Sequence, residues 1–379
     1  MNLPLTVRRS IELLGLFLLG TIIVAGKNII MPVLMAFFIS IMLLPVYRFL
    51  KKYKIPESLA IFISILMVAI GVSSIVWFFS SQIGKLVADF PQIQENVSLH
   101  LAALSKWINS ISDFSTAEQL KFLNEQNAKL LNYAASMLQG AAMSVTSALI
   151  FIGLLPIYIY LMLFYKNLLI RFVFMWFKEP QHKKVEEVMK ESESIIKSYL
   201  LGLLIQIAYI TILLGGILMI IGIEHALLIG VIFAILNLIP YVGALIGNVI
   251  GVALTLTSSQ ELWPIFTVLG VIAFVQFLDN NILMPRIVGS KVKINALSAI
   301  VGVFAGGSIA GIPGMFLSLP VIAVLKIIFD RSDMFRHWGV LLGDERPAKS
   351  PMSFPYLRRK DRKTVEKIKS EDDKSEKKK

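Results

Sequence analysis

Residues 226–256 form an apolar run that predicts the architecture of the chain, because it is too long for one membrane span and is broken at its centre. The run reads ALLIGVIFAILNLIPYVGALIGNVIGVALTL. Pro240 lacks an amide hydrogen and clashes with the preceding helical turn, and Gly243 loosens the backbone. The parts on either side hold about 13 and about 15 residues, whereas about 20 are needed to cross the hydrocarbon core. The pattern therefore predicts two short helices joined by a break.

A second broken segment covers residues 297–329 and has the sequence AGGSIAGIPG at its centre, from Ala305 to Gly314. An uninterrupted apolar run precedes each broken segment, at 199–223 and at 263–282. The two pairs resemble one another, which predicts a repeat of one span followed by one broken segment. Close packing of glycine-rich helices is the competing interpretation of the same residues.

Charge distinguishes two ways of threading these segments through a membrane. If each broken segment crossed once, Arg286, Lys291 and Lys293 would lie outside, although Lys and Arg collect on the cytoplasmic side. If each segment enters and returns to its own side, the 283–296 loop is cytoplasmic. The second threading also gives the two repeats opposite orientations, which is typical of secondary transporters with a site where the breaks meet.

The composition excludes a soluble enzyme, a fibrous protein and a disordered chain. Of the 379 residues, 56% are hydrophobic and 16% are charged, against about a quarter charged in soluble domains. Further spans are predicted at about residues 6–26, 29–50, 58–81 and 141–165. A signal peptide is the alternative for the first of these runs. We expect an all-α, polytopic helical membrane protein with two broken, re-entrant segments and an extramembrane helical hairpin.

Basic residues near the N-terminus and in the 48–57 and 166–197 loops place these parts on the cytoplasmic side. The chain divides into spans 1–3 (1–81), extramembrane amphipathic helices (82–140), the fourth span with a basic loop (141–197), a core transport unit with two inverted repeats (198–330) and a charged, largely disordered cytoplasmic tail (331–379). The apolar stripes of 82–140 leave three roles open: packing within the hairpin, contact between subunits, or contact with the membrane surface.

Polar residues inside apolar runs indicate the candidate site, because an aspartate near the bilayer centre costs about 2.5–3.5 kcal/mol. Gln276, Asp279 and Asn280 lie on nearly one helical face, and Gln206 lies within the 199–223 span. The predicted substrate-binding residues are Asn237, Pro240, Tyr241, Gly243, Gln276, Asp279, Asn280, Gly307, Ser308 and Pro313. The alternatives are that Asp279 pairs with Arg286 or Lys291 at the headgroups, and that Asn237 caps its helix.

Several kinds of chemistry have no motif in the sequence. There is no cysteine, no phosphate-binding loop of the G-x-x-x-x-G-K-[ST] type and no H-E-x-x-H pair. We therefore expect no enzymatic activity, no catalytic residues, no metal site and no cofactor. The net charge of +12 is interpreted as a topology signal and not as a nucleic-acid site.

The stretch from Asp279 to Gly289 reads DNNILMPRIVG and, together with Gly306-Gly307 and Gly311-Ile312-Pro313-Gly314, resembles the autoinducer-2 exporter family. The stretch NLIPYVG from Asn237 to Gly243 resembles the family's other marker, and the likeness covers about residues 8–340. The resemblance implies a multi-pass transporter of the bacterial inner membrane that forms a homo-oligomer, for which a pentamer is one candidate. Family members are described as exporters of a furanone-type signal, autoinducer-2, used in quorum sensing, and some as sodium–proton antiporters.

Three functions follow as hypotheses. The first is a secondary transporter that exports a small polar solute resembling autoinducer-2, and the second is cation–proton antiport with Asp279 as the titrating group. The third, of another class, is an oligomeric membrane scaffold that uses the 82–140 helices and the tail. The expected partners are a small polar solute or cation, the lipid bilayer and further copies of the chain. Both termini are expected to be cytoplasmic.

Overall fold

The computed structural model describes residues 5–89, 91–92, 95–96, 98–100, 102–103, 153–239, 242–283, 294–332 and 335–344. Most of the predicted 82–140 helices, the start of the fourth span, residues 284–293 of the 283–296 loop and the tail beyond 344 lie outside these residues. The described part is helical and contains no strand. Its elements are α1 (Leu5–Ala25), α2 (Lys27–Lys52), α3 (Glu57–Ala88), the helix Gly153–Phe164, α6 (Lys166–Met175), η1 (Glu179–Gln181), α7 (His182–Ile210), η2 (Thr211–Gly215), α8 (Gly216–Ile221), α9 (Ala226–Leu236), α10 (Val242–Ser258), α11 (Trp263–Leu278), η3 (Asp279–Leu283), α13 (Ala296–Asp330) and α14 (Arg336–Leu342).

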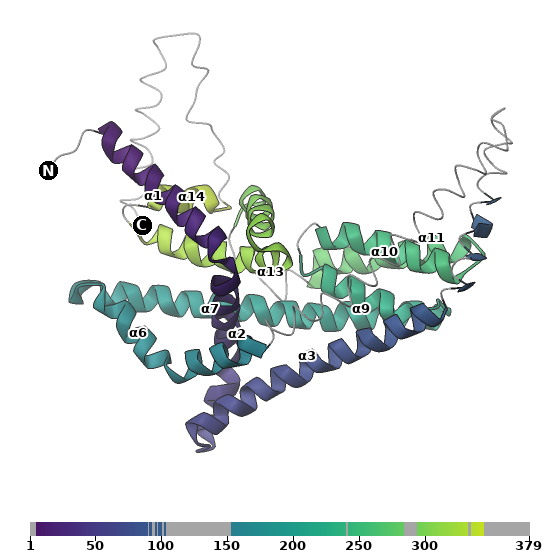
Figure 1. Ribbon diagram of the computed structural model, residues 1–379, viewed down its shortest axis with the longest axis horizontal. Helices are drawn as coiled ribbons and strands as arrows, with labels where there is room; N and C mark the ends of the chain where they lie inside the picture. The colour runs from purple at the N-terminus through teal and green to yellow at the C-terminus, as the bar shows by residue number, and fades with distance from the viewer. Residues whose placement is uncertain are drawn as a thin grey trace, which may run out of the picture.

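The helices confirm a polytopic all-α membrane protein. Among the described residues, five helices are long and apolar enough to cross a membrane, or six if the bent pair Gly153–Phe164 and Lys166–Met175 is one span. The α1 helix carries Arg8, Arg9 and Glu12, so its composition alone does not qualify it, and its crossing stays a prediction. In Figure 1, α6 lies at one end of the long α7 helix, and α9, α10 and α11 gather toward the other end.

Two helices are longer than the spans predicted for them. The α3 helix continues past Ser81 to Ala88, into the segment expected to be extramembrane. The basic 166–197 segment is largely helical, because α6 and the first half of α7 occupy it. Glu186 and Lys190 form an ion pair one turn apart on α7, which suits a helix surface outside the hydrocarbon region.

The broken segment 226–256 folds into an antiparallel pair of helices, α9 and α10, which we call hairpin 1. A Cβ atom at Gly243 would overlap the backbone of Leu236, and one at Gly247 would lie 2.6 Å from the ring of Phe233. Residues later in α10 thus contact residues earlier in α9, so the two helices are antiparallel. Glycines spaced four residues apart let the two backbones approach closely, as small residues do in membrane helix packing.

The second broken segment also turns back on itself, because α13, from Ala296 to Asp330, consists of two helices joined at a kink. Ala310 (φ −140°, ψ 20°) and Gly311 (φ 61°, ψ −142°) leave the helical conformation. A Cβ atom at Gly302 would overlap the side chain of Ile322, whereas twenty residues of straight helix would separate them by about 30 Å. The arms on either side of this turn form hairpin 2.

The two hairpins begin and end at opposite ends of the bundle. At the ends of hairpin 1, His225 Nε2 lies 3.9 Å from Asp89 Oδ2, and His100 Nε2 lies 2.8 Å from the carbonyl oxygen of Ser259. Hairpin 1 therefore opens toward the residues that follow α3.

Hairpin 2 opens toward the basic segments instead. Just beyond its end, Arg331 Nη1 lies 3.0 Å from Glu187 Oε2, in the region where Arg48 pairs with Glu193 at 2.9 Å. At its start, the Asn295 side chain donates to the carbonyl oxygen of Gly343 (2.9 Å). These contacts agree with the threading in which both segments return to their own sides. The repeat, the entry of the hairpins into lipid and the cytoplasmic side stay predictions.

Apolar packing joins the core unit to the first spans. Ile210, Leu218, Phe233 and Ile272 belong to one cluster that unites α7, α8, α9 and α11. Another cluster joins α2, α7 and the second arm of hairpin 2 through buried Phe38, Tyr199 and Leu317, with Leu238 from the tip of hairpin 1 packed against it. Both hairpins thus meet the same group of side chains.

Gly306→Ala tests the packing of hairpin 2. A Cβ atom there would overlap the backbone of Gly314, so we expect the free energy of unfolding to fall by about 1–3 kcal/mol, as for other overpacked cores. Titration with SDS in mixed micelles measures it. Gly270→Ala on α11 is the control, because no atom of the described residues lies within 4 Å of a Cβ atom there. Equal stability of the two variants would show that the arms do not touch.

Cysteine labelling tests the course of hairpin 1, because the chain has no native cysteine to interfere. Glu224→Cys and Glu261→Cys place single thiols at exposed positions just before α9 and just after α10. We expect a membrane-impermeant maleimide to label both from the same side of intact vesicles. Labelling from opposite sides would mean that the segment crosses the membrane once.

Candidate substrate and ion site

The carboxylate of Asp279 is buried where three separate parts of the chain meet. Asp279 follows α11 as the first residue of η3, and only 1% of its surface is exposed. Its Oδ2 atom accepts hydrogen bonds from Gln206 Nε2 on α7 (2.9 Å) and from Asn237 Nδ2 at the end of α9 (3.0 Å). A carboxylate can only accept, so these bonds orient both amides. No ion pair to Asp279 comes from the described residues, and Arg286 and Lys291 lie outside them.

Further polar atoms near this part of the sequence are buried without hydrogen-bond partners in the described part of the chain. They are Gln206 Oε1, Tyr209 Oη, Thr211 Oγ1, Gln276 Oε1 and Asp279 Oδ1. Buried polar groups nearly always have partners, and an unsatisfied one costs about 1–3 kcal/mol. All five belong to α7–η2 or to α11–η3. The concentration of unsatisfied groups on two helices is the property expected of a site that binds a polar ligand or ion.

Both helices that carry these atoms contain a π-helical segment. In η2, Thr211–Gly215 follows directly after α7, and in η3, Asp279–Leu283 follows directly after α11. A π-helical turn inserts an extra residue, shifts the side-chain register and occurs frequently at functional sites. Here it changes the helical geometry at Thr211 and at Asp279 themselves.

The end of α9 explains how Asn237 reaches the site. The residue before a proline avoids the helical conformation, so the helix stops before Pro240. Asn237 occupies the C-cap position, where its amide hydrogen still bonds to Phe233. Its side chain bonds across to Asp279 and does not cap its own helix, which favours the site interpretation. Gly243 then lets α10 start directly against Leu236.

The remaining predicted site residues outside hairpin 2 are Gln276, Asn280, Pro240 and Tyr241. Gln276 is half-buried and donates to Asn280, which is exposed, over a long 3.4 Å. Pro240 and Tyr241 lie outside the described residues. Among the described residues, Gln276 therefore adds an unsatisfied oxygen three residues before Asp279, whereas Asn280 is exposed.

The predicted residues of hairpin 2 contact their own hairpin. A Cβ atom at Gly307 would lie 2.5 Å from Met315, and the Ser308 hydroxyl donates to the carbonyl oxygen of Phe304 (2.9 Å). Ser308 is exposed, and Pro313 begins the second arm beyond the turn. Their part in a binding site stays a prediction. Conversely, Gln206 was visible in the sequence as a polar residue within a span, but only the structure shows that it bonds to Asp279.

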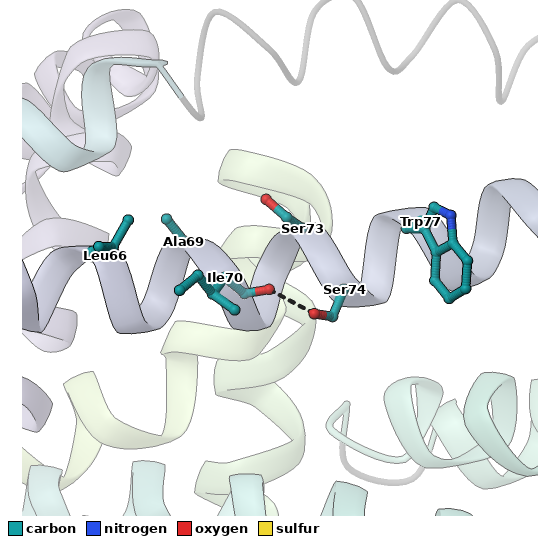
Figure 2. Close-up of a pocket in the computed structure, with 6 residues that line it drawn as sticks. All are labelled: Leu66, Ala69, Ile70, Ser73, Ser74 and Trp77. Carbon is teal, nitrogen blue, oxygen red and sulfur yellow. Dashed lines mark hydrogen bonds between the residues drawn. The ribbon is translucent and has the colours of Figure 1, made fainter.

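A pocket on α3 has none of these properties. Figure 2 shows six side chains along one face of this single helix, Leu66, Ala69, Ile70, Ser73, Ser74 and Trp77. The Ser74 hydroxyl donates to the carbonyl oxygen of Ile70 (2.8 Å), and none of the six is charged. The Trp77 side chain is 74% exposed. This is the surface of an apolar helix, so we place the candidate site at Asp279.

Comparison with known proteins matches nearly the whole chain to a family of transporters. The family model described as AI-2E family transporter matches residues 13–333. The chain is 24% identical over 311 residues to YrrI of Bacillus subtilis, covering 80% of this chain and 86% of YrrI. It is 28% identical to YueF of the same organism, covering 83% and 86%. TqsA of Escherichia coli, named an AI-2 transport protein, is 23% identical, covering 84% of this chain and 90% of TqsA.

A double-mutant cycle tests the Gln206–Asp279 contact. Gln206→Leu removes one of the two donors to the buried Asp279 carboxylate, and Asp279→Leu leaves the buried Gln206 amide without its acceptor, so each is expected to lower the free energy of unfolding by about 1–3 kcal/mol. The double variant removes both polar groups, so it is expected to lose at least about 0.5 kcal/mol less than the sum. SDS titration measures all four proteins. Additive losses would mean that the two side chains do not interact.

Proposed function

Because this chain belongs to the AI-2E transporter family, we propose that it is a secondary transporter whose site is centred on Asp279 and whose cargo is a small polar solute. The observation that supports this most directly is the buried Asp279 carboxylate. It accepts hydrogen bonds from Gln206 on α7 and from Asn237, which lies at the tip of hairpin 1. Polar residues at membrane depth line substrate and ion pathways. Broken helices near the midplane are where secondary transporters bind cargo.

The unsatisfied atoms support a cargo rich in hydroxyl groups. Within the described residues, Gln206 Oε1, Gln276 Oε1 and Asp279 Oδ1 have no hydrogen-bond donor and can accept from a ligand, and the hydroxyls of Tyr209 and Thr211 can both donate and accept. A small molecule with several hydroxyls fits this set, and an autoinducer-2-like signal is the member of that class that the name of TqsA suggests. We propose export of such a molecule as the specific function.

The shared apolar cluster supports a mechanism of alternating access. Movement of the α7–α13 unit against α2 would expose the Asp279 site first to one side and then to the other. Phe38 of α2, Tyr199 of α7 and Leu317 of hairpin 2 lie at the boundary between the two groups of helices. We infer that side chains repack at this boundary. The apolar cluster that unites α7, α8, α9 and α11 holds hairpin 1 to the neighbouring helices, so these helices are expected to move together.

Transport by purified protein in liposomes tests the proposal. We expect Asp279→Asn and Asn237→Ala to lower the rate of autoinducer-2 uptake at least about tenfold, equivalent to 1.4 kcal/mol in the barrier. Thr267→Ala is the control, since Thr267 lies on the same α11 helix, is partly exposed and, among the described residues, donates its hydroxyl to the carbonyl oxygen of Trp263 one turn earlier. Equal rates in wild type, Asp279→Asn and Asn237→Ala would reject the site.

Cation–proton antiport is the second candidate, and it is favoured by the burial of a carboxylate whose Oδ1 has no partner in the part of the chain that the structure describes. Oxygen atoms are the ligands that hard cations prefer, and a single carboxylate can hold either a cation or a proton. In inside-out vesicles, a pH-sensitive dye would then report proton movement on addition of sodium. Asp279→Asn would abolish the signal, and Thr267→Ala would retain it. Autoinducer-2 uptake without a sodium-dependent pH change would exclude this candidate.

We further propose that the protein resides in the bacterial inner membrane with both termini cytoplasmic and assembles as a homo-oligomer. The basic segments around Arg48 and Lys166 support the orientation, since they lie at one end of the bundle. Membership in a transporter family makes the scaffold hypothesis the least favoured of the three.

A further inference from the structure

Three side chains with metal-binding atoms meet at the end of the bundle where hairpin 1 opens. Asp89 follows the end of α3, and Glu224 and His225 form the turn between α8 and α9. One atom from each, two carboxylate oxygens and an imidazole nitrogen, lie within 4.8 Å of one another. The two chain segments are far apart in the sequence, so their meeting results from the fold.

The local backbone fixes this arrangement. The α8 helix ends at Gly222 in the left-handed conformation (φ 88°), and His225 begins the next helix in the same region (φ 56°). This tight turn places Glu224 outward and buries the imidazole, whose side chain is only 7% exposed. Because α3 continues for seven residues beyond Ser81, Asp89 reaches the same place. The Asp89 side chain is 41% exposed, so the cluster is open to solution on one side.

A simple ion pair accounts poorly for these three groups. His225 Nε2 lies 3.9 Å from Asp89 Oδ2, beyond hydrogen-bond distance, and no hydrogen bond to the imidazole comes from elsewhere in the described residues. The ring is thus more than nine-tenths buried and directed at a carboxylate that it does not reach. A second carboxylate beside the first adds repulsion between like charges. A bound cation would remove both unfavourable features.

We propose that Asp89, Glu224 and His225 bind a divalent transition-metal cation of the Zn²⁺ or Mn²⁺ type. One imidazole and two carboxylates form a mixed nitrogen and oxygen donor set that suits these ions. Mg²⁺ and Ca²⁺ prefer oxygen donors alone, so the histidine disfavours them. The exposed side leaves room for water molecules to complete the coordination.

The position of this site suggests what the cation does, a consequence that depends on the proposed transport function. The cation would join α3 to the first residue of hairpin 1. The α9 helix runs from this point for 11 residues, about 16 Å, to Asn237 at the Asp279 site. A bound ion therefore restrains α9, the helix whose end carries Asn237 of the proposed transport site. Transport is expected to slow while the ion is bound.

Titration of the purified full-length protein with Co²⁺ tests the binding site, because Co²⁺ substitutes for Zn²⁺ and absorbs visible light when protein ligands replace water. We expect wild type to show this absorption and Zn²⁺ to displace it. Loss of a group that merely supports a metal ligand costs about tenfold to hundredfold in affinity, so loss of a ligand in His225→Asn or Asp89→Asn should cost at least as much. Asparagine suits the left-handed backbone at 225.

Glu261→Gln is the matched control, since it removes an exposed negative charge at the same end of the bundle. It is expected to bind Co²⁺ as wild type does. Absence of the absorption in wild type at millimolar Co²⁺, or equal affinities in wild type, His225→Asn and Asp89→Asn, would overturn the proposed site.

The restraint is tested separately in liposomes. We expect Zn²⁺ to slow transport by wild type and by Glu261→Gln but not by His225→Asn, and equal slowing of all three would reject the restraint. Failure of the transport proposal can be told apart from failure of the metal site. The transport proposal is tested by comparing Asp279→Asn with wild type in the absence of metal, and the metal site is tested by Co²⁺ binding, which does not require transport.

Discussion

Burial of the Asp279 carboxylate is the constraint on which the arrangement of the core helices depends. A charged group within an apolar region costs several kcal/mol unless fixed partners compensate it. Its two donors, Gln206 and Asn237, come from different helices and reach the same oxygen atom. A side-chain amide spans only a few ångströms, so α9 has to end beside α7 at the depth of Asp279. The position of the polar site therefore determines where hairpin 1 has to turn.

Close backbone packing makes such a turn possible in a lipid environment. Lipid tails are as apolar as leucine, so packing contacts rather than hydrophobic burial hold membrane helices together. Gly243 and Gly247 bring α10 against α9, and Gly306 and Gly314 bring together the arms of hairpin 2. A side chain at any of these positions would separate the arms. The tip that carries Asn237 is consequently held by contacts on both arms, which fixes the direction of its amide.

The sequence predicts those features that local physics determines. Proline and glycine weaken a helix, and each broken segment combines both residues at the centre of an apolar run that is too long for one span, so both broken segments were identifiable. The cost of burying polar groups drew attention to Asp279 and Asn237. The partnership of Gln206 was not predictable, because it depends on how α7 packs against α9. The π-helical turns at Thr211 and Asp279 have no recognisable sequence pattern. The basic 166–197 segment was interpreted only for its charge, although ion pairs such as Glu186–Lys190 also suit a helix.

The two hairpins differ in what they bring to the centre of the molecule. Hairpin 1 carries an amide to a buried carboxylate, whereas the Ser308 hydroxyl of hairpin 2 bonds to its own helix and is exposed. Yet Leu317 of hairpin 2 and Leu238, next to Asn237, pack in the same cluster with Phe38 and Tyr199. Closely packed side chains transmit displacement, because there is little free volume to absorb it. A shift of hairpin 2 against α2 therefore changes the packing around Leu238 and, one residue away, the position of the amide that holds Asp279.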